Sequence, residues 1–304
     1  MNYNLITILG PTATGKTSIA AKLAAELNGE IISADSRQVY IGMDIGTGKD
    51  LNEIKYRNVN YHLIDICEPT EEYNLFRFKK DFNAAFREIT AQKKFPILVG
   101  GTVLYISSVL QNYLLPQIKS DEEKLKKLLS LDKNELLMLL FSLSSKLHNT
   151  TDLINKERII KAILIEQSKE NLSNEKSNIV SLNIGIKPER SIINQNITGR
   201  LKARLKSGMI KEVEALLQKG IKKEKLKFFG LEYRYLTQYV TGELNYNDMF
   251  QKLNSAIHNF SKRQLTWFRK MEKEGVEINW FKGTNYDEIL YFTKAELNKK
   301  DANT

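Results

Sequence analysis

The sequence predicts an α/β protein in which helices flank a parallel sheet and an all-α insertion interrupts it. Three observations predict this fold. Short apolar, β-branched runs alternate with helical patterns through the first 110 residues. A glycine-rich loop joins the first of these runs to the first helix. From about residue 118 to 181 the β pattern is replaced by amphipathic helical patterns. We therefore predict a core of residues 1–117 and 182–304 with a helical insertion at 118–181.

The glycine-rich loop follows the apolar run Leu5–Leu9 and precedes the Ala/Leu-rich stretch Ser18–Leu27. It matches the pattern G-x-x-x-x-G-K-[ST] in the context of strand, loop and helix, which is typical of a P-loop NTPase-like core. Glycines let the backbone fold around an anion, while amides, a lysine and a hydroxyl bind its oxygens. The pattern predicts a diphosphate-binding loop made of Gly10, Pro11, Thr12, Ala13, Thr14, Gly15, Lys16 and Thr17.

The remaining elements follow from periodicity and from glycine and proline stops. We predict further strands at 30–35, 61–65, 96–99 and 179–186. Beyond the first helix, we predict helices at 73–90, 103–110, 121–131, 133–147, 156–167, 190–207, 211–219, 231–240 and 247–273.

Asp35 stands at the carboxyl end of the second predicted strand, where open α/β sheets bind their ligands. A carboxylate there holds magnesium through water or acts as a base on a substrate beside the phosphates. The structural alternative, a side chain that only caps the following turn, fits the position equally well. Lys49, in the glycine-containing loop 42–49, leaves two alternatives as well: a contact with phosphate or a solvated side chain.

The charge balance favours a phosphate-rich partner larger than one nucleotide. The chain holds 46 Lys and Arg against 36 Asp and Glu, a net charge of +10. Ten basic residues against three acidic ones fall between Arg200 and Lys227, and such clustering is typical of nucleic-acid binding.

No apolar run approaches the roughly eighteen residues needed to cross a bilayer, so we expect no membrane association. The first strand begins near the N-terminus with no leader pattern, and Cys67 is the only cysteine. We expect a cytoplasmic protein and, because no exposed apolar stripe is evident, a monomer.

The last long predicted helix carries the segment 262–269, which contains three basic and two aromatic residues. We expect Arg263 to reach phosphate. Trp267 and Phe268 face either the core, the more common outcome for an aromatic stripe, or a base-stacking surface.

Together, six ordered segments resemble the bacterial tRNA dimethylallyltransferases, or isopentenyl-tRNA transferases. The resemblance covers about residues 4–281 and rests on segments 10–17, 33–40, 42–47, 62–65, 96–102 and 262–269. It implies transfer of a dimethylallyl group from dimethylallyl diphosphate to the exocyclic N6 amine of the adenosine 3′ of the anticodon, in tRNAs that read codons beginning with U. It also implies Mg²⁺ as cofactor and the anticodon stem-loop as partner.

The resemblance implies a role for particular residues. Asp35 is the general base, and Thr17 binds magnesium. Arg200 helps to hold the diphosphate. The tRNA contacts implied are Asp35, Ser36, Arg37 and Gln38 beside the target base, Glu157, Arg158, Ile159, Ile160 and Lys161 at the edge of the insertion, and Lys262 and Arg263 on the last long helix.

The chain departs from the family pattern at Lys161 and Asn196, where arginines are usual, and at 228–235, which is two residues longer. These departures concern the tRNA contacts. Three other functions stay open: an adenylate dimethylallyltransferase that acts on free nucleotide, a P-loop small-molecule kinase, and a nucleotide-switched RNA-binding protein. The kinase would need an arginine-rich lid, whereas the insertion is dominated by lysine, leucine and serine.

Overall fold

The computed structural model describes residues 3–49, 51–113, 122–143, 153, 155–168 and 178–299. The chain divides into two compact units: one of residues 1–111 and 178–304, and one of residues 112–177. The helical insertion thus begins at 112 rather than 118 and ends at 177 rather than 181. Residues 178–180 belong to the larger unit and precede the strand Ser181–Ile186, and Val180 hydrogen-bonds with Asn4 beside the first strand.

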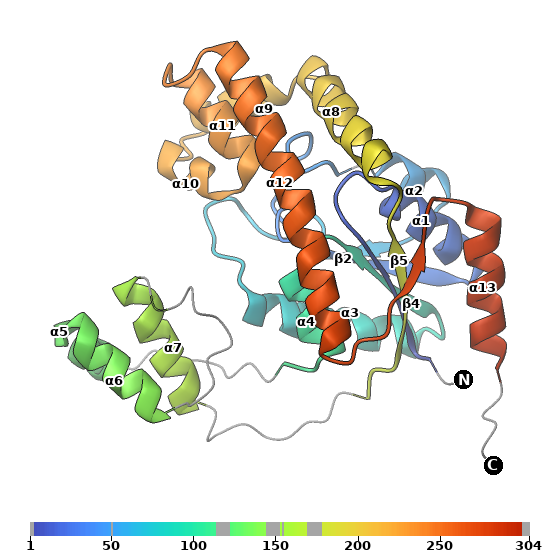
Figure 1. Ribbon diagram of the computed structural model, residues 1–304, viewed down its shortest axis with the longest axis horizontal. Helices are drawn as coiled ribbons and strands as arrows, with labels where there is room; N and C mark the ends of the chain where they lie inside the picture. The colour runs from blue at the N-terminus through green and yellow to red at the C-terminus, as the bar shows by residue number, and fades with distance from the viewer. Residues whose placement is uncertain are drawn as a thin grey trace. The chain divides into compact units, whose positions relative to one another are not determined.

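The larger unit is built on six parallel strands (Figure 1). Their order across the sheet is β3 (Tyr61–His62), β2 (Gly29–Ala34), β4 (Phe95–Gly100), β1 (Leu5–Leu9), β5 (Ser181–Ile186) and β6 (Asn279–Phe281). Side chains alternate between the two faces, as the two-residue period of a strand requires. In β1, for example, Leu5 and Leu9 enter one core cluster and Ile6 and Ile8 enter the other.

Helices cover both faces of this sheet. One face packs against α1 (Lys16–Glu26), α2 (Asn52–Tyr56) and α13 (Tyr286–Asn298). The larger cluster on the other face includes residues of α3 (Leu75–Ala91), α4 (Val103–Leu110), α8 (Arg190–Lys206), α9 (Met209–Gln218), α10 (Lys223–Phe228), α11 (Leu231–Val240) and α12 (Tyr246–Lys273). Among the described residues, no helix is both long and apolar enough to span a membrane.

In the described part of the smaller unit, three helices surround an apolar cluster of their own. They are α5 (Glu122–Ser130), α6 (Lys133–Leu143) and α7 (Lys156–Ser168). Leu128, Leu136, Leu140 and three isoleucines of α7 form its core. The absence of β patterns from this stretch therefore correctly predicted a helical unit.

The predicted strand 61–65 is wrong beyond residue 62. Leu63 and Asp65 have φ angles of 63° and 55°, in the left-handed region, so the chain leaves the sheet at this point. Apolar residues are present there, but Leu63 and Ile64 are buried in an irregular turn. Four elements were not predicted: α2, α10, β6 and α13.

Candidate active site

The glycine-rich loop has the predicted context, between β1 and α1. A side-chain carbon on Gly10 would lie 2.3 Å from the carbonyl oxygen of Ile186, so the close approach of the loop to β5 requires glycine. Gly15 has a φ angle of 78° and precedes α1. That helix has no side-chain cap and no acidic residue in its first turn. Its first amides and the positive end of its dipole are therefore available to an anion.

Two residues of α8 fix the conformation of the loop. Arg200 donates a hydrogen bond to the hydroxyl of Thr12, so its guanidinium lies beside the loop. Asn196 donates to the carbonyl of Ala13 at 3.2 Å. Asn196, which stands where the family usually has arginine, therefore contacts the loop backbone but brings no positive charge.

Lys16 is the loop residue with the most altered acid–base behaviour. Its ammonium donates to the carbonyl of Pro11 at 2.6 Å. Burial and the nearby charge of Arg200 lower the pKa of Lys16 to about 7, although the Asp35 carboxylate opposes the shift. An arriving diphosphate would favour the charged ammonium again.

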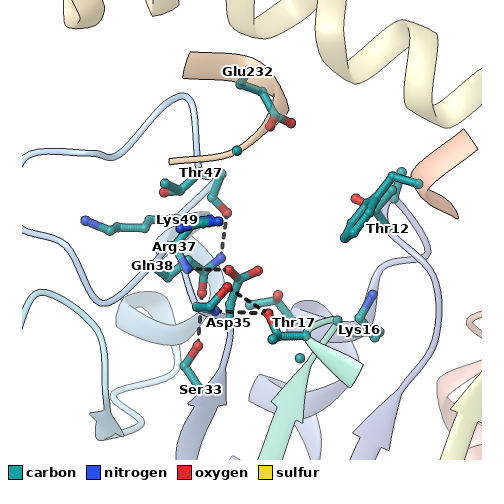
Figure 2. Close-up of a pocket in the computed structure, with 18 of the residues that line it drawn as sticks. Thr12, Lys16, Thr17, Ser33, Asp35, Arg37, Gln38, Thr47, Lys49 and Glu232 are labelled. Atoms are coloured by element: carbon teal, nitrogen blue, oxygen red, sulfur yellow. Dashed lines mark hydrogen bonds between the residues drawn. The ribbon is translucent and has the colours of Figure 1, made fainter. Parts of the chain in front are cut away.

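Asp35 follows β2 and lines the same cavity as Lys16 and Thr17 (Figure 2). Its Oδ1 accepts a hydrogen bond from the amide of Arg37 at 2.9 Å, so the capping alternative describes a real contact. The second carboxylate oxygen has no protein partner among the described residues. The cap and a role as base are therefore compatible.

The three residues after Asp35 connect the end of β2 to its neighbours. The Ser36 amide donates to the Thr102 hydroxyl at 3.0 Å, beside the end of β4. The Gln38 side chain accepts from Ser33 at 3.1 Å and donates to the Gly48 carbonyl at 3.1 Å. The guanidinium of Arg37 lies over the ring of Phe228, with 5.9 Å between the guanidinium carbon and the ring centroid.

The cavity at this edge of the sheet has a volume of about 460 Å³. Polar residues of the glycine-rich loop and β2 line it together with apolar side chains such as Val99, Leu104 and Ile257. A second cavity of about 610 Å³ lies between the loop and α8. The two cavities share four lining residues: Ala13, Lys16, Thr17 and Arg200. The predicted diphosphate site is therefore bordered by two openings.

Glu232 is a cavity residue that the sequence did not reveal as functional. It lies in the first turn of α11, across the cavity from Asp35 in Figure 2. Burial raises the pKa of its carboxyl, and the charges of Arg204 and Arg200 counteract part of the shift. The only signal was its position inside the 228–235 departure from the family pattern.

The loop 42–49 forms another wall of the cavity and is fixed by ion pairs. The solvated alternative for Lys49 is wrong, since its side chain is 1% exposed and binds Asp44 at 2.8 Å, Asp65 and the Tyr40 carbonyl at 2.6 Å. Across the loop, Gly48 packs against the guanidinium of Arg204. The lysine therefore holds the loop at the border of the cavity, and its contact with phosphate stays a prediction.

The two neighbouring aromatic residues of α12 differ in their surroundings: one lies in the core and the other lines the cavity. Phe268 is fully buried, whereas Trp267 is 39% exposed and lines the cavity. Arg263 also lines the cavity, and its guanidinium lies over the Phe260 ring at 5.9 Å. Lys262 is exposed outside the cavity lining.

In the helical unit, the predicted tRNA-contacting stretch lies on α7. Glu157, Arg158 and Lys161 are exposed, but Ile159 and Ile160 are buried in the core of the unit. The two isoleucine side chains therefore hold α7 in the core of the unit, and contact of this segment with tRNA stays a prediction that rests on its exposed residues.

Comparisons with known proteins agree with this arrangement. The family model described as IPP transferase matches residues 38–271. "tRNA dimethylallyltransferase 2" of Citrifermentans bemidjiense is 49% identical, over 93% of this chain and 92% of that protein. The crystal structure of a tRNA isopentenylpyrophosphate transferase from Bacillus halodurans is similar with a TM-score of 0.71 and 31% identity, covering 97% and 96% of the two chains. A eukaryotic dimethylallyltransferase acting on tRNA shares the fold, with a TM-score of 0.80 at 20% identity, covering 97% of this chain and 79% of that one.

Proposed function

The chain belongs to the IPP transferase family, and on this premise we propose that it is a tRNA dimethylallyltransferase. The dimethylallyl group of dimethylallyl diphosphate is transferred to the N6 amine of the adenosine 3′ of the anticodon, in tRNAs that read codons beginning with U. Diphosphate is released. One observation carries the proposal: the carboxylate of Asp35 and the diphosphate-binding loop line one cavity.

The reaction divides between these two groups. The lone pair of N6 attacks C1 of the dimethylallyl group, and the C1–O bond breaks with its electron pair leaving on diphosphate. The amine proton passes to Asp35, the general base. Its Oδ1 is oriented by the Arg37 amide, which leaves Oδ2 to accept the proton.

Charge on the leaving diphosphate is neutralised by the loop amides, by Lys16 and by Arg200. Magnesium fits the available donors, because it prefers oxygen ligands and retains several waters. The described residues contain no group of three or more His, Cys, Asp or Glu placed to hold a metal ion. Thr17, water and the diphosphate oxygens would hold magnesium, which would stabilise the negative charge on the leaving group.

The target adenosine must leave the anticodon loop stack to reach Asp35. The cavity accommodates an extruded base, since its wall includes Trp267 and Phe260 as aromatic surfaces and Arg37 and Arg263 as cations. A single chain supplies the base and the diphosphate cradle, which supports action as a monomer.

The test is transfer of labelled dimethylallyl diphosphate to an unmodified anticodon stem-loop, with free AMP as competing acceptor. Asp35→Asn is the informative variant because its side-chain oxygen still accepts from the Arg37 amide but no longer takes a proton. We expect label in the stem-loop with the wild type and a loss of at least about a hundredfold in Asp35→Asn.

Other outcomes point to the other enzymes. Label in AMP alone would make the protein an adenylate dimethylallyltransferase. No transfer, together with phosphoryl transfer from ATP to a small acceptor, would favour the kinase. Undiminished transfer by Asp35→Asn would reduce Asp35 to a turn cap.

A further inference from the structure

Gln264, on α12, bridges two backbone segments of the site. Its Oε1 accepts a hydrogen bond from the amide of Thr12 at 2.9 Å, and its Nε2 donates to the carbonyl of Gly101 at 2.7 Å. The side chain is 3% exposed, so water competes little for either bond. One amide group therefore links the diphosphate-binding loop to the turn that follows β4.

The turn after β4 is shaped to accept this amide. A side-chain carbon on Gly101 would lie 2.7 Å from Nε2 of Gln264. The glycine thus allows the side-chain amide of Gln264 to approach the backbone of the turn closely.

The diphosphate-binding loop needs such support, because its conformation is strained. Ala13 has a φ angle of 63°, which costs a residue with a side chain about 1 kcal/mol. Such strain persists only where surrounding contacts fix it. Gln264 fixes the amide of Thr12, and Arg200 fixes the hydroxyl of Thr12. Asn196 fixes the carbonyl of Ala13. Contacts from α8 and α12 therefore hold the loop from outside.

We propose that Gln264 is a positioning residue that holds the loop in its diphosphate-binding conformation. It commits the Thr12 amide to a protein partner and so determines that the later loop amides and the α1 amides receive the phosphates. This role rests on the proposed function in one respect only: the proposed function identifies the bound phosphate compound as a diphosphate. Gln264 neighbours Arg263 in sequence but contributes through the loop and not through RNA.

The experiment measures binding of inorganic diphosphate by calorimetry and, separately, the kinetics of prenyl transfer. Gln264→Met keeps much of the side-chain volume and removes both hydrogen bonds. In Gly101→Ala, the added methyl group displaces the side-chain amide of Gln264 from the turn, while residue 264 itself is not substituted. For each variant we expect the Kd for diphosphate and the KM for dimethylallyl diphosphate to rise about tenfold, the effect of one or two lost hydrogen bonds. The KM for the stem-loop stays unchanged.

Gln251→Met, an exposed glutamine on the same helix, is the matched control and leaves every constant unchanged. Gly101→Ala supplies the test if Gln264→Met does not fold. An unchanged Kd for diphosphate in folded Gln264→Met, or in Gly101→Ala when it is the only folded variant, would overturn the proposal. So would a rise confined to the KM for the stem-loop. Diphosphate binding needs no prenyl transfer, so a wild type without transferase activity would refute the proposed function while leaving this test intact.

Discussion

The carboxylate of Glu212 accepts a hydrogen bond from the amide of Gly46 at 2.9 Å and thereby attaches the loop 42–49 to α9. The same carboxylate accepts from the amides of Asp44 and Ile45 at 2.8 and 2.7 Å and from the buried Tyr233 hydroxyl at 2.7 Å. A side-chain carbon on Gly46 would lie 2.6 Å from the Tyr233 ring. One of the few acids of the basic 200–227 region thus holds Gly46 and Tyr233, which line the cavity.

Glu212→Gln should loosen this loop. A glutamine has one acceptor oxygen and presents its amide hydrogens to backbone donors, so we expect a loss of about 2 kcal/mol in local stability. Hydrogen exchange at residues 44–46 should accelerate, and the KM for the stem-loop should rise. Glu214→Gln, an exposed change on the same helix, is the control and should change neither. Unaltered exchange in Glu212→Gln would show that the loop is held by its other contacts.

Lys16 should make diphosphate binding depend on pH. Because its pKa is about 7 in the free protein, the ammonium is charged below pH 7 and loses its proton above it. We expect the affinity for inorganic diphosphate to fall about fivefold from pH 7 to pH 8, beyond any change seen with Lys16→Met. Calorimetry at both pH values measures this difference. Equal pH dependence in the two proteins would contradict a lowered pKa.

The same shift has a consequence for folding. The folded-state pKa of Lys16 lies below its ordinary value of 10.5, so the unfolded chain binds more protons between pH 7 and 10.5. The wild type gains stability from this group as pH rises through that window. Lys16→Met should therefore be more stable than the wild type at pH 7, and the difference should shrink by pH 10. Denaturant unfolding at pH 7 and pH 10 measures the two free energies of unfolding. A Lys16→Met protein that is less stable than the wild type at pH 7 would contradict the prediction.

Glu232→Gln should strengthen diphosphate binding at alkaline pH, where the wild-type carboxyl is ionised. The carboxylate opposes the positive field of Arg200 and Arg204, and its removal leaves that field to the anion. We expect a several-fold lower Kd at pH 8. The pKa of Glu232 is raised, so the wild-type carboxyl becomes neutral sooner as pH falls and the two proteins should converge in acid. A constant ratio of the two affinities across pH would exclude this electrostatic effect.

Glu30 supports the opposite end of the sheet. Lys94, His62 and Asn60 donate to its carboxylate at 2.5, 2.7 and 2.8 Å, and its side chain is 3% exposed. Burial raises the pKa of Glu30, but these donors outweigh it and lower the pKa to about 2. Its contribution to stability is thus complete above pH 4.5 and lost as pH falls toward 2.

Glu30→Gln should accordingly reduce the free energy of unfolding by about 3 kcal/mol at pH 7, the cost of breaking a buried pair. Denaturant unfolding measures it, and the difference from the wild type should vanish near pH 2. Glu26→Gln, which removes an exposed pair with Lys294, should cost less than 1 kcal/mol. Because β2 carries Glu30 at its start and ends just before Asp35, we expect full transferase activity in folded Glu30→Gln. A similar cost for both variants would mean that the Glu30 cluster adds nothing beyond a surface pair.

Contiguous features could be predicted from the sequence. The glycine-rich loop between β1 and α1, the position of Asp35 after β2, and the helices of the insertion each depend on neighbouring residues. The loss of β-strand structure after His62 could not be predicted, because Leu63 and Ile64 are apolar in either conformation. A strand and a turn differ at residues 63–65 by left-handed φ angles, which the tertiary structure imposes.

Contacts between distant residues were beyond the sequence. Gln264 and Thr12 are 252 positions apart, and Glu212 and Asp44 are 168 positions apart. No periodicity or local motif relates such positions. Lys49 shows the same limit: its partner Asp65 lies across a turn whose shape the sequence pattern misjudged. The roles of these residues follow from what surrounds them.

The separation of Gln264 from Thr12 also affects how the protein is made. During synthesis the diphosphate-binding loop leaves the ribosome almost first, but β5, which completes the pairing of β1, follows only at residue 181, and Arg200 and Gln264 emerge later still. A growing chain that ends before residue 264 has Lys16 and Thr17 but lacks a contact that fixes their loop. The full set of contacts that fixes this loop is therefore assembled only near the end of translation.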